Sequence, residues 1–303
     1  MISIIIPIYN AGKTLKKTLD SIKRQSYQNI EVVLINDGST DRTEEICKEY
    51  VEKDHRFKYY YQDNKGVSEA RNNGMRKASG KFITFIDADD IVDKEYCEIL
   101  RRYSGDVDIV VCDISIEQNG VELKRFTMPN VCIDTTEALN NLFIRKNINS
   151  GPSGKLIKKE LLKNIIFPDL TTYEDIIFNM KLFEEAKNVF VTNQTQYHYV
   201  QNNEGAMSKM LKCPSIDIIK ATDIMMEYIS NHDELDDECA YVTLSHLLQY
   251  VYIVKDNKSY GSDTFLKGAK EVFSKYRKQI LQCRAFPWKE KILFGLYSFG
   301  IGF

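Results

Sequence analysis

The sequence predicts an α/β fold in which a mostly parallel, Rossmann-like sheet is flanked by helices. Over the first hundred residues, short apolar runs rich in β-branched residues alternate with segments whose apolar residues recur at helical spacing. Strands and helices repeated in this order form parallel sheets with helices on both faces. Ligands bind to such sheets beyond the carboxyl ends of the strands. Polar clusters follow the predicted strands at that edge, at residues 7–10, 36–41, 63–66 and 87–90.

The elements of this first part follow one another in a regular order. Residues 2–8 are a run dominated by β-branched isoleucine, which suits a strand buried on both faces. We interpret Asn10 as a helix cap, because Leu15, Leu19 and Ile22 then recur at helical spacing. The further predicted elements are strands at 31–35, 57–61 and 82–86 and helices at 41–51 and 68–78.

The rest of the chain is less regular at first and then helical. A strand is expected at 106–113, a loop at 151–154 followed by a short helix, and an amphipathic segment at 171–187. From about Pro214 the pattern is helical, with two candidate apolar stripes: Ile216, Ile219, Ile224 and Met225, and then Tyr241, Leu244, Leu247, Leu248 and Val251. We therefore predict two domains, an α/β domain at 1–210 and a helical C-terminal extension at 211–303.

Composition argues against several classes of protein. A net charge of -2 over 303 residues gives no reason to expect a nucleic-acid partner. The seven cysteines are scattered and form no CxxC pair, which argues against a disulfide framework and a structural zinc site. No basic segment precedes the short apolar run at the start, and no window approaches the roughly 20 apolar residues of a spanning helix. We therefore expect a cytoplasmic protein.

Three carboxylates follow the fourth predicted strand, in the segment Asp87-Ala88-Asp89-Asp90. Carboxylates gathered at a ligand-binding edge repel one another unless a cation or hydrogen-bond donors compensate their charge. One interpretation is a divalent metal that Asp89 holds and that bridges a diphosphate, with Asp87 near a ribose. The other is a turn or helix cap, since a lone D-x-D motif is common.

Two further segments place polar groups at the same edge. Asp37 ends the second predicted strand, where its carboxylate can accept from a nucleobase, and Gly38 lets the backbone approach a flat ligand. Arg71 lies early in the helix after Gly66 and can pair with a phosphate or with a carboxylate of the site. An Asx turn at Asp37 and an ordinary surface arginine at Arg71 stay open as alternatives.

Taken together, these segments resemble the family-two glycosyltransferases with the GT-A fold. The matching strings are SIIIPIYNAGKTLKKTLDSIKRQSY, EVVLINDGSTDRT, GVSEARNNGM and GKFITFIDADD, in the family's order and spacing, and the resemblance covers residues 1–210. It implies that this part is the catalytic domain and that Asp89 belongs to a metal site. The nucleotide-binding residues that it implies are Pro7, Tyr9, Asn10, Asp37, Gly66, Arg71, Asp87 and Ala88.

The same family carries an acidic general base further along the chain. The segment Tyr173-Glu174-Asp175 resembles it, which implies Asp175 as the base and Glu174 as a neighbour that contacts the donor or acceptor sugar. From the residues alone, two acids that open an amphipathic helix favour the helix dipole and need no catalytic role.

A later segment resembles the part of bacterial polysaccharide transferases that closes over the diphosphate. It comprises Tyr197-His198-Tyr199 and residues 202–208. Val200 stands where those enzymes often have an arginine, so a basic contact is not expected there. The resemblance implies His198 as a metal ligand and Ser208 as a diphosphate contact. A histidine between two tyrosines can equally be a packed strand residue.

The resemblance implies an inverting transfer of a sugar from a nucleotide diphosphate donor, expected to be a UDP-sugar. The expected acceptor is a hydroxyl of a glycan or a lipid-linked oligosaccharide, as in capsule or other bacterial surface-polysaccharide assembly. Asp175 would take the acceptor proton, and Mn²⁺ or Mg²⁺, which prefer hard oxygen ligands, would neutralise the leaving diphosphate.

Three alternative functions have different sequence signatures. The first is a catalytically degenerate sugar-nucleotide binder, or a scaffold of a polysaccharide assembly complex. Loss of the metal or base carboxylates would favour it, but Asp87, Asp89 and Asp175 are all present. A nucleotidyltransferase usually has a glycine-rich basic loop after its first strand, for which residues 10–13 are a poor substitute. A dehydrogenase has a G-x-G-x-x-G there, and this chain does not.

The last third of the chain carries a basic segment beside an apolar one. Eight lysines and arginines between residues 267 and 291 stand against two acids, and aromatic and aliphatic residues occupy 286–288 and 292–297. This combination suits peripheral contact with the inner face of the cell membrane. The alternative is a solvated helix face whose tail packs on the core or on the other subunit of a homodimer.

Overall fold

The computed structural model describes residues 1–118, 120–201, 214–257 and 262–299. Its strands are β1 (Ile2–Ile8), β2 (Ile30–Asp37), β3 (Phe57–Gln62), β4 (Phe82–Phe85), β5 (Ile91–Val92), β6 (Ile109–Gln118), β7 (Val121–Phe126), β8 (Val131–Ile133), β9 (Lys155–Lys158) and β10 (Val189–Val200). Its helices are α1 (Leu15–Lys23), α2 (Thr43–Lys53), α3 (Val67–Lys77), α4 (Tyr96–Tyr103), α5 (Thr135–Ile144), α6 (Glu174–Glu185), α8 (Asp217–Ser230), α9 (Asp237–Asn257), α10 (Ser262–Lys275), α11 (Arg277–Gln282) and α12 (Trp288–Ser298).

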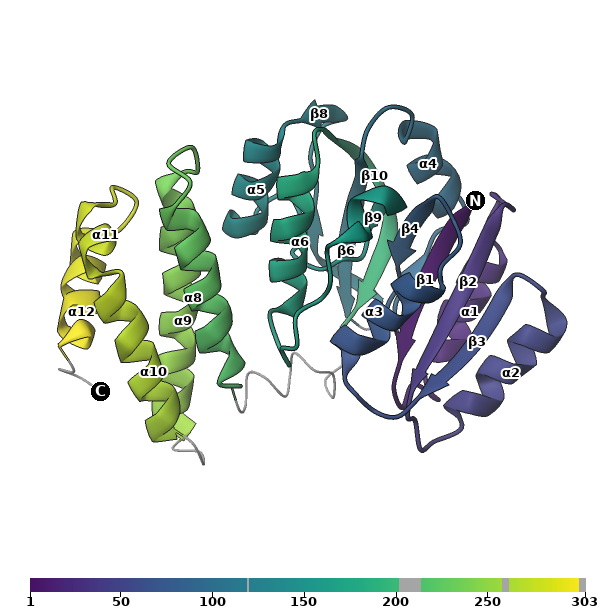
Figure 1. The fold of residues 1–303 in the computed structure, drawn as a ribbon, viewed down its shortest axis with the longest axis horizontal. Coiled ribbons are helices and arrows are strands. Elements are labelled where there is room, and N and C mark those ends of the chain that lie inside the picture. Colours follow the sequence, from purple (N-terminus) through teal and green to yellow (C-terminus); the bar gives the residue numbers. More distant parts are fainter. Residues whose placement is uncertain (119, 202–213, 258–261, 300–303) are drawn as a thin grey trace. The chain divides into compact units, whose positions relative to one another are not determined.

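One sheet of ten strands organises the α/β part. Figure 1 shows this sheet with its flanking helices. Its main order is β3-β2-β1-β4-β9-β6-β10-β5, while β7 pairs with β6 and β8 pairs with β10. The first four strands of this order are parallel to one another. The predicted parallel sheet flanked by helices is therefore confirmed.

Strand β1 lies at the centre of the parallel part because both of its faces are apolar. All seven of its residues are buried, and Ile4 pairs with Val32 of β2 on one side and Thr84 of β4 on the other. Leu15, Leu19 and Ile22 of α1 belong to the same hydrophobic core, as their spacing predicts. Burial of such aliphatic side chains contributes about 1.5–3 kcal/mol each relative to exposure.

The prediction that Asn10 caps the first helix was wrong. Helix α1 begins only at Leu15, and Asn10 has a left-handed backbone with φ +48°. Its Oδ1 accepts a hydrogen bond from the backbone N–H of Thr40 at 2.8 Å. The side chain therefore ties the loop after β1 to the loop after β2, instead of satisfying a helix terminus.

The segment after the 151–154 loop also differs from the prediction. Residues 155–158 form strand β9, and only Lys159–Lys163 form a helix, a short 3₁₀ turn. Strand β9 is antiparallel to both β4 and β6, so β6 runs parallel to β4 and the sheet continues beyond its parallel half. The region before residue 149, where no element was predicted, holds β7, β8 and α5.

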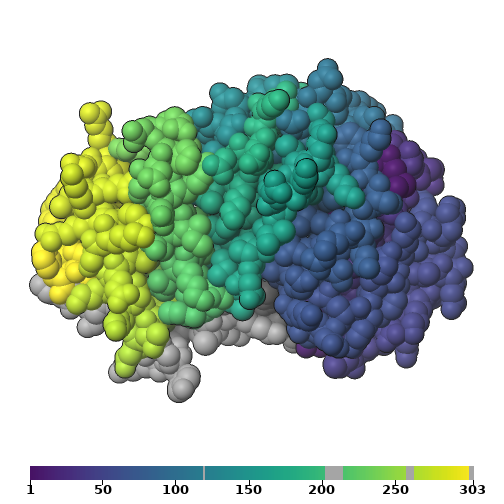
Figure 2. Space-filling model, viewed as in Figure 1, coloured from purple at the N-terminus to yellow at the C-terminus, as the bar shows by residue number. Residues whose placement is uncertain are grey.

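The chain divides into two compact units. The first comprises residues 1–138 and 145–201 and contains the sheet, and the second comprises residues 139–144 and 202–303. The second unit is helical in its described parts, α8 to α12, which confirms the predicted extension. Figure 2 shows the side-chain surface of these helices in green and yellow.

Within the second unit, one of the two predicted stripes is correct. Leu244, Leu247, Leu248 and Val251 of α9 are buried. The stripe predicted for α8 is correct only at Met225, because Ile216 and Ile224 are 41% and 39% exposed, and the buried face carries Ile218, Ala221 and Ile229 beside Met225. Among the described residues, no helix is long and apolar enough to cross a bilayer.

Candidate active site

The carboxyl ends of β1, β2, β3 and β4 meet at one edge of the sheet, because these strands are parallel. The loop after β1 is fastened there to the loop after β2. The backbone N–H of Gly12 donates to Asp41 Oδ2 at 2.9 Å, and Arg42 Nε donates to the Gly12 carbonyl at 3.0 Å. Pro7 is buried in β1, whereas Tyr9 is 54% exposed beside this pair of loops.

Asp37, at the end of β2, braces the loop that leads into α3. Its Oδ1 accepts from Gln62 Nε2 and from the Lys65 N–H, both at 2.8 Å, and its Oδ2 accepts from the Gly66 N–H at 2.9 Å. A carboxylate offers about four acceptor positions, so one remains on Oδ2 for a ligand. Gly66 has φ +87°, which a glycine adopts without strain.

Gly38 serves a different purpose from the one its sequence position indicates. A Cβ built on it would lie 2.8 Å from the Asn64 backbone nitrogen, and its φ is +72°. The close approach that requires glycine is therefore between two protein loops, and it lets Asp37 reach its three donors.

The acidic loop after β4 lies at the same edge. The Asp87 side chain is 29% exposed, Asp89 is half-buried, and Asp90 is fully buried. Asp90 accepts from the Tyr197 hydroxyl at 2.5 Å and from the Val200 N–H at 3.0 Å. Burial raises the pKa of Asp90, and the charges of Asp87 and Asp89 raise it further, so the three carboxylates lie close enough to repel one another.

The Ala88 carbonyl of this loop is also engaged. It accepts a hydrogen bond from the Thr14 hydroxyl at 3.1 Å, just before α1 begins. The acidic loop and the loop after β1 are therefore joined directly.

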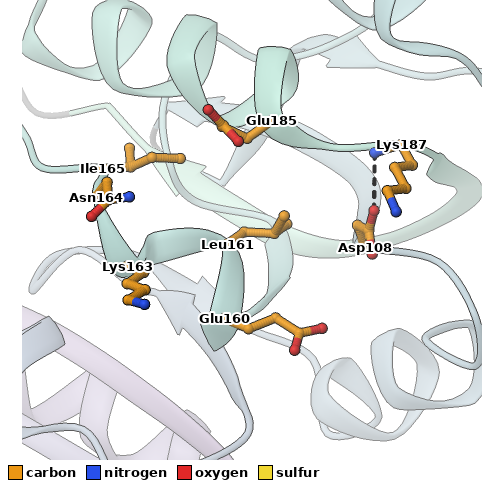
Figure 3. Close-up of a pocket in the computed structure, with 8 residues that line it drawn as sticks. All are labelled: Asp108, Glu160, Leu161, Lys163, Asn164, Ile165, Glu185 and Lys187. Atoms are coloured by element: carbon orange, nitrogen blue, oxygen red, sulfur yellow. Dashed lines mark hydrogen bonds between the residues drawn. The ribbon is translucent and has the colours of Figure 1, made fainter.

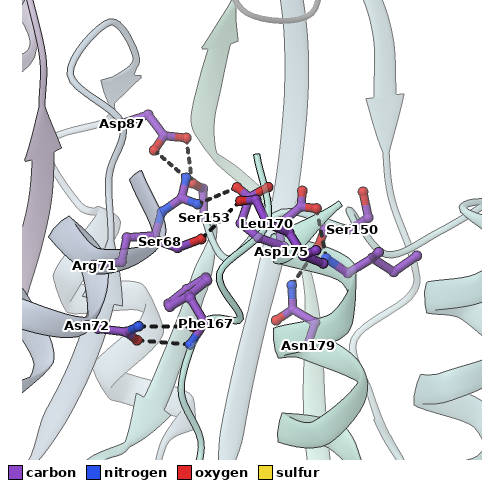
Figure 4. A network of polar contacts seen from close by, with 12 residues as sticks. Ser68, Arg71, Asn72, Asp87, Ser150, Ser153, Phe167, Leu170, Asp175 and Asn179 are labelled. Carbon is purple, nitrogen blue, oxygen red and sulfur yellow. Dashed lines mark hydrogen bonds and ion pairs between the residues drawn. The ribbon is translucent and has the colours of Figure 1, made fainter. Parts of the chain in front are cut away.

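Arg71 of α3 links the acidic loop to α6. Its guanidinium donates to Asp87 Oδ1 at 3.1 Å and to Glu174 Oε1 at 2.9 Å, and its side chain is only 7% exposed (Figure 4). Burial alone would lower the pKa of Arg71, but the charges of Asp87 and Glu174 raise it above its usual value. Of the two predicted partners, phosphate and site carboxylate, the structure shows the carboxylate.

Helix α3 is also held to the segment that precedes α6. Asn72 exchanges two hydrogen bonds of 2.9 Å with the backbone of Phe167, as Figure 4 shows. The Arg71 Cζ lies 5.2 Å from the centre of the Phe167 ring, and the Ser68 hydroxyl donates to the Leu170 carbonyl at 3.4 Å. These contacts fix where α6 begins relative to the acidic loop.

Helix α6 opens with the two acids that the sequence singles out. Glu174 is buried against Arg71, and Asp175 is half-buried with its Oδ1 accepting from the Ile176 N–H at 2.8 Å. Burial raises the pKa of Asp175 to about 6, with the charge of Glu174 adding to the rise and that of Arg71 opposing it. A carboxyl with this pKa can release and accept a proton close to neutral pH.

Carboxylates of the acidic loop and of the start of α6 both raise the pKa of Tyr199. Burial raises the pKa of Tyr199 to about 12, and the charges of Asp90, Asp89, Asp87 and Asp175 contribute in that order. The acidic loop and the start of α6, which Arg71 already joins, therefore both lie near Tyr199.

His198 has protein partners at both ring nitrogens. Nδ1 lies 2.7 Å from Glu117 Oε1 and 2.9 Å from the Ser115 hydroxyl, and Nε2 lies 3.2 Å from Asp93 Oδ1. The interpretation of His198 as a packed strand residue fits this geometry. Ser208, the predicted diphosphate contact, lies outside the described residues.

The loop at 151–154, which the sequence predicts but to which it assigns no role at the site, contacts the acidic loop and, through the adjacent Ser150, helix α6. The Ser153 hydroxyl donates to Asp87 Oδ2 at 3.3 Å, and Asn179 of α6 donates to the Ser150 carbonyl at 2.6 Å (Figure 4). Lys155, fully buried, donates to the Asn149 and Gly151 carbonyls at 2.9 and 2.6 Å. Burial lowers the pKa of Lys155 to about 7. A single lysine in the string GPSGK gives no sign that its amine is buried.

A cavity of about 300 Å³ lies elsewhere in the first unit (Figure 3). Its lining residues are Asp108, Glu160, Leu161, Lys163, Asn164, Ile165, Glu185 and Lys187. Asp108 immediately precedes β6, which runs parallel to β4, so the cavity lies at the amino edge of the sheet. It is therefore separate from the carboxylates described above.

The carboxyl edge thus offers an exposed aromatic ring, a carboxylate with a remaining acceptor position and a group of acids held by one arginine. In the described ranges, no group of three or more histidine, cysteine, aspartate or glutamate residues is arranged to hold a metal ion alone. A cation at the acidic loop would therefore need oxygen ligands from a bound molecule as well as from Asp89 or Asp87.

Comparison with known proteins gives consistent results. The model of the family described as "Glycosyl transferase family 2" matches residues 3–166, more than half of the chain. Glycosyltransferase GlyA of Streptococcus pneumoniae is 34% identical over 220 residues, which are 69% of this chain and 32% of GlyA. Cholesterol galactosyltransferase of Borreliella burgdorferi is 30% identical over 276 residues, 86% of this chain and 75% of that protein.

Solved structures agree with these relatives in fold. S. aureus TarS 1-349 in complex with UDP-GlcNAc has a TM-score of 0.78 at 20% identity, covering 99% of this chain and 88% of that one. This chain spans only about a third of GlyA, whose sequence extends well beyond the shared part.

Proposed function

Since this chain belongs to glycosyl transferase family 2 and has the GT-A fold, we propose that it transfers a sugar from a nucleotide diphosphate donor to an acceptor hydroxyl. One observation carries the proposal. Arg71 holds Asp87 of the acidic loop and Glu174, the neighbour of Asp175, at one buried point. Donor-side and acceptor-side carboxylates are thereby brought to the same locus.

We assign the nucleotide to the first half of this edge. Tyr9 offers an exposed ring on which a base can stack, and Asp37 has one acceptor position left for a base N–H. Pro7, Asn10, Gly66 and Ala88 supply backbone around it. A uridine diphosphate donor is proposed because the TarS neighbour was solved with UDP-GlcNAc.

Arg71 is assigned to positioning. Both of its terminal nitrogens already contact carboxylates, so it acts on the donor by orienting Asp87 instead of by reaching a phosphate. This refines the nucleotide-binding role that the sequence predicts for it.

We propose that a divalent cation, Mn²⁺ or Mg²⁺, binds at Asp89 when the donor is present. Asp87 and Asp89 supply hard carboxylate oxygens at the ligand edge, which is the donor chemistry these ions prefer. Asp89 is chosen over His198, whose ring nitrogens both contact protein acceptors. The cation, when bound, would neutralise charge on the leaving diphosphate.

We propose Asp175 as the general base of an inverting transfer. Its pKa of about 6 leaves it mostly ionised at neutral pH and able to take the proton of an attacking hydroxyl. Glu174 is buried and pairs with Arg71, which ties the start of α6 to the acidic loop, so it is assigned to positioning. With Asp175 on the acceptor side, no covalent intermediate is required.

We assign catalysis to the α/β unit, and we propose that the helical unit binds the acceptor or a membrane surface. The acceptor is proposed to be a glycan or a lipid-linked oligosaccharide. A relative named for cholesterol, covering 86% of this chain, supports an acceptor that has a lipid part.

The test is turnover of a panel of nucleotide sugars by the purified chain, after treatment with a chelator and then with Mn²⁺ or Mg²⁺ restored. We expect slow donor hydrolysis that needs the cation and prefers a UDP-sugar. Binding of UDP without turnover of any donor, with a panel of glycan acceptors present, would instead identify a degenerate sugar-nucleotide binder.

A further inference from the structure

Helix α12 has two apolar sides, and only one of them is covered. Phe294 packs edge-on against Phe273 of α10 with ring centres 5.0 Å apart, and Tyr297 lies 6.5 Å from the Tyr252 ring of α9. The side chains of Phe294 and Tyr297 are buried. The tail that the sequence leaves open between core packing and surface contact therefore packs on its own unit through this side.

The other side of α12 is an exposed apolar stripe. Trp288, Ile292, Leu296 and Phe299 are 68%, 54%, 41% and 59% exposed. At about 100° per residue their directions fall within an arc of about 80°, on the side opposite Phe294 and Tyr297. Such grouping on one face is not the scatter of single exposed apolar residues that protein surfaces normally carry.

Basic side chains border this stripe. By the same helical spacing, Lys289 and Lys291 project on its two sides. Between residues 277 and 299 the chain has five basic residues and one acid, Glu290. That acid is directed inward, where its Oε1 lies 3.3 Å from the Tyr241 hydroxyl. The exposed side of α12 is therefore apolar at its centre and positive at its rim.

The preceding helix contributes to the same surface. Lys291 Nζ donates to the Leu281 carbonyl at 3.0 Å, which joins the end of α11 to α12, and Leu281 is 49% exposed. The Arg277 guanidinium lies 4.0 Å from the centre of the Phe299 ring. An arginine next to an exposed ring can keep its charge at the level of lipid headgroups while the ring enters the acyl region.

We propose that this surface, formed by Leu281, Trp288, Ile292, Leu296 and Phe299 with their basic rim, docks on an anionic lipid bilayer. An apolar stripe bordered by lysines is the pattern of a helix that lies in the plane of the headgroups. Anionic lipid compensates the positive rim, whereas a second copy of the chain would bring two positive rims together. This inference concerns the helical unit alone and does not depend on the sugar-transfer proposal.

Trp288 is the chain's only tryptophan, so it reports docking directly. The full-length protein is titrated with vesicles of phosphatidylcholine alone and of phosphatidylcholine with 30–40% phosphatidylglycerol (roughly the anionic content at which basic segments bind). We expect a blue shift of Trp288 emission and co-flotation with the anionic vesicles only, weakened by added salt.

Matched variants test whether vesicle binding depends on the stripe or on nonspecific adsorption of exposed apolar residues. Ile292→Ser with Leu296→Ser should lower partitioning to anionic vesicles about tenfold or more. The control, Ile216→Ser just before α8 with Ile224→Ser on α8, replaces isoleucines of 41% and 39% exposure and should leave partitioning unchanged. Lys289→Gln should weaken binding about fivefold, because it removes one charge from the rim.

Three outcomes would overturn the proposal. The first is no emission shift and no flotation with anionic vesicles, and the second is equal loss of binding in the α8 control. The third is an emission shift that follows protein concentration in the absence of lipid, together with a dimer by light scattering, because the occupant would then be a second copy. Donor turnover is measured separately in solution, so failure of either proposal leaves the other intact.

Discussion

The guanidinium of Arg71 donates a hydrogen bond of 2.9 Å to the carboxylate of Glu174 across 103 residues of sequence. Both side chains are nearly inaccessible to water, at 7% and 12% exposure. A charge buried in this way is tolerated only when it is paired, and Arg71 has Asp87 as its second partner. The contact therefore both stabilises the fold and fixes the distance between the two acidic segments.

We predict that Arg71→Met destabilises the protein by about 3–5 kcal/mol, because it leaves Asp87 and Glu174 without their buried counter-charge. Urea denaturation at neutral pH measures the change. Arg76→Met is the matched control on the same helix, since Arg76 is 57% exposed and pairs with Glu69 at the surface. It should change stability by less than about 1 kcal/mol. Similar losses in both variants would show that the Arg71 pairs are not structurally important.

We predict that Asp175→Asn abolishes transfer and leaves nucleotide binding nearly intact. In the unaltered protein, kcat/KM should fall about tenfold per pH unit below the Asp175 pKa of about 6, because only the ionised form accepts a proton. Glu185→Gln, at the exposed far end of α6, is the control. Turnover that survives in Asp175→Asn would remove this residue from the role of base.

The same variant should gain stability. The folded-state pKa of Asp175 lies above the ordinary value of 3.8, so the folded protein binds the proton more tightly than the unfolded chain. The resulting stabilisation is complete below about pH 4 and is lost as the pH rises through about 6. Above that pH, Asp175→Asn should be more stable than the parent by about 2 kcal/mol. Loss of stability together with activity would indicate a structural role instead.

The sequence was sufficient for the parallel half of the sheet because local pattern and burial agree there. Residues 2–8 are apolar except for Ser3, and all seven are buried, as a strand with neighbours on both faces requires. The place of Asp37 and Asp87 at one edge follows from the rule that parallel strands end together, whereas Asp175 is singled out by the family resemblance. These parts needed no knowledge of distant contacts.

The failures share one physical cause, which is a partner far away in sequence. The Oδ1 of Asn10 can cap a helix, which is why the sequence predicts a cap there. In the structure this oxygen instead accepts a hydrogen bond from the backbone N–H of Thr40, 30 residues further along the chain. Strand β9 was missed because lysines begin and end it, and only burial between β4 and β6 makes Lys155 a strand residue. Ile216, just before α8, and Ile224 on α8 are exposed but as apolar as the buried residues of this helix. Residue type alone therefore does not show which face of α8 packs on its neighbours.

Lys155 gives a prediction with a distinct pH signature. Burial lowers its pKa from 10.5 to about 7, so the unfolded chain binds the proton more tightly than the folded protein. The penalty is complete below about pH 7 and is relieved as the pH rises toward the unfolded value. Relative to Lys155→Met, the parent should therefore gain about 1 kcal/mol of stability per pH unit between pH 7 and 9.

The control for Lys155 is Asn179 of α6, which contacts the same loop. Asn179 donates to the Ser150 carbonyl at 2.6 Å, and its amide does not titrate. Asn179→Ala should therefore cost about 1–3 kcal/mol with no slope against pH. A flat difference between the parent and Lys155→Met would show that the amine is already solvated, and the loop would then need another explanation for its position.

Gly38→Ala tests whether the Asp37 loop depends on the close approach of two backbones. Alanine at φ +72° is strained, and its Cβ would lie 2.8 Å from the Asn64 nitrogen, a backbone atom that cannot rotate away. We expect a loss of about 2–3 kcal/mol in unfolding free energy and weaker nucleotide binding, because the three donors to Asp37 shift together. Gly105→Ala has no atom within 4 Å of its new methyl group and should be nearly neutral. If Gly38→Ala binds UDP as tightly as the parent, the loop that Asp37 braces does not form the nucleotide site.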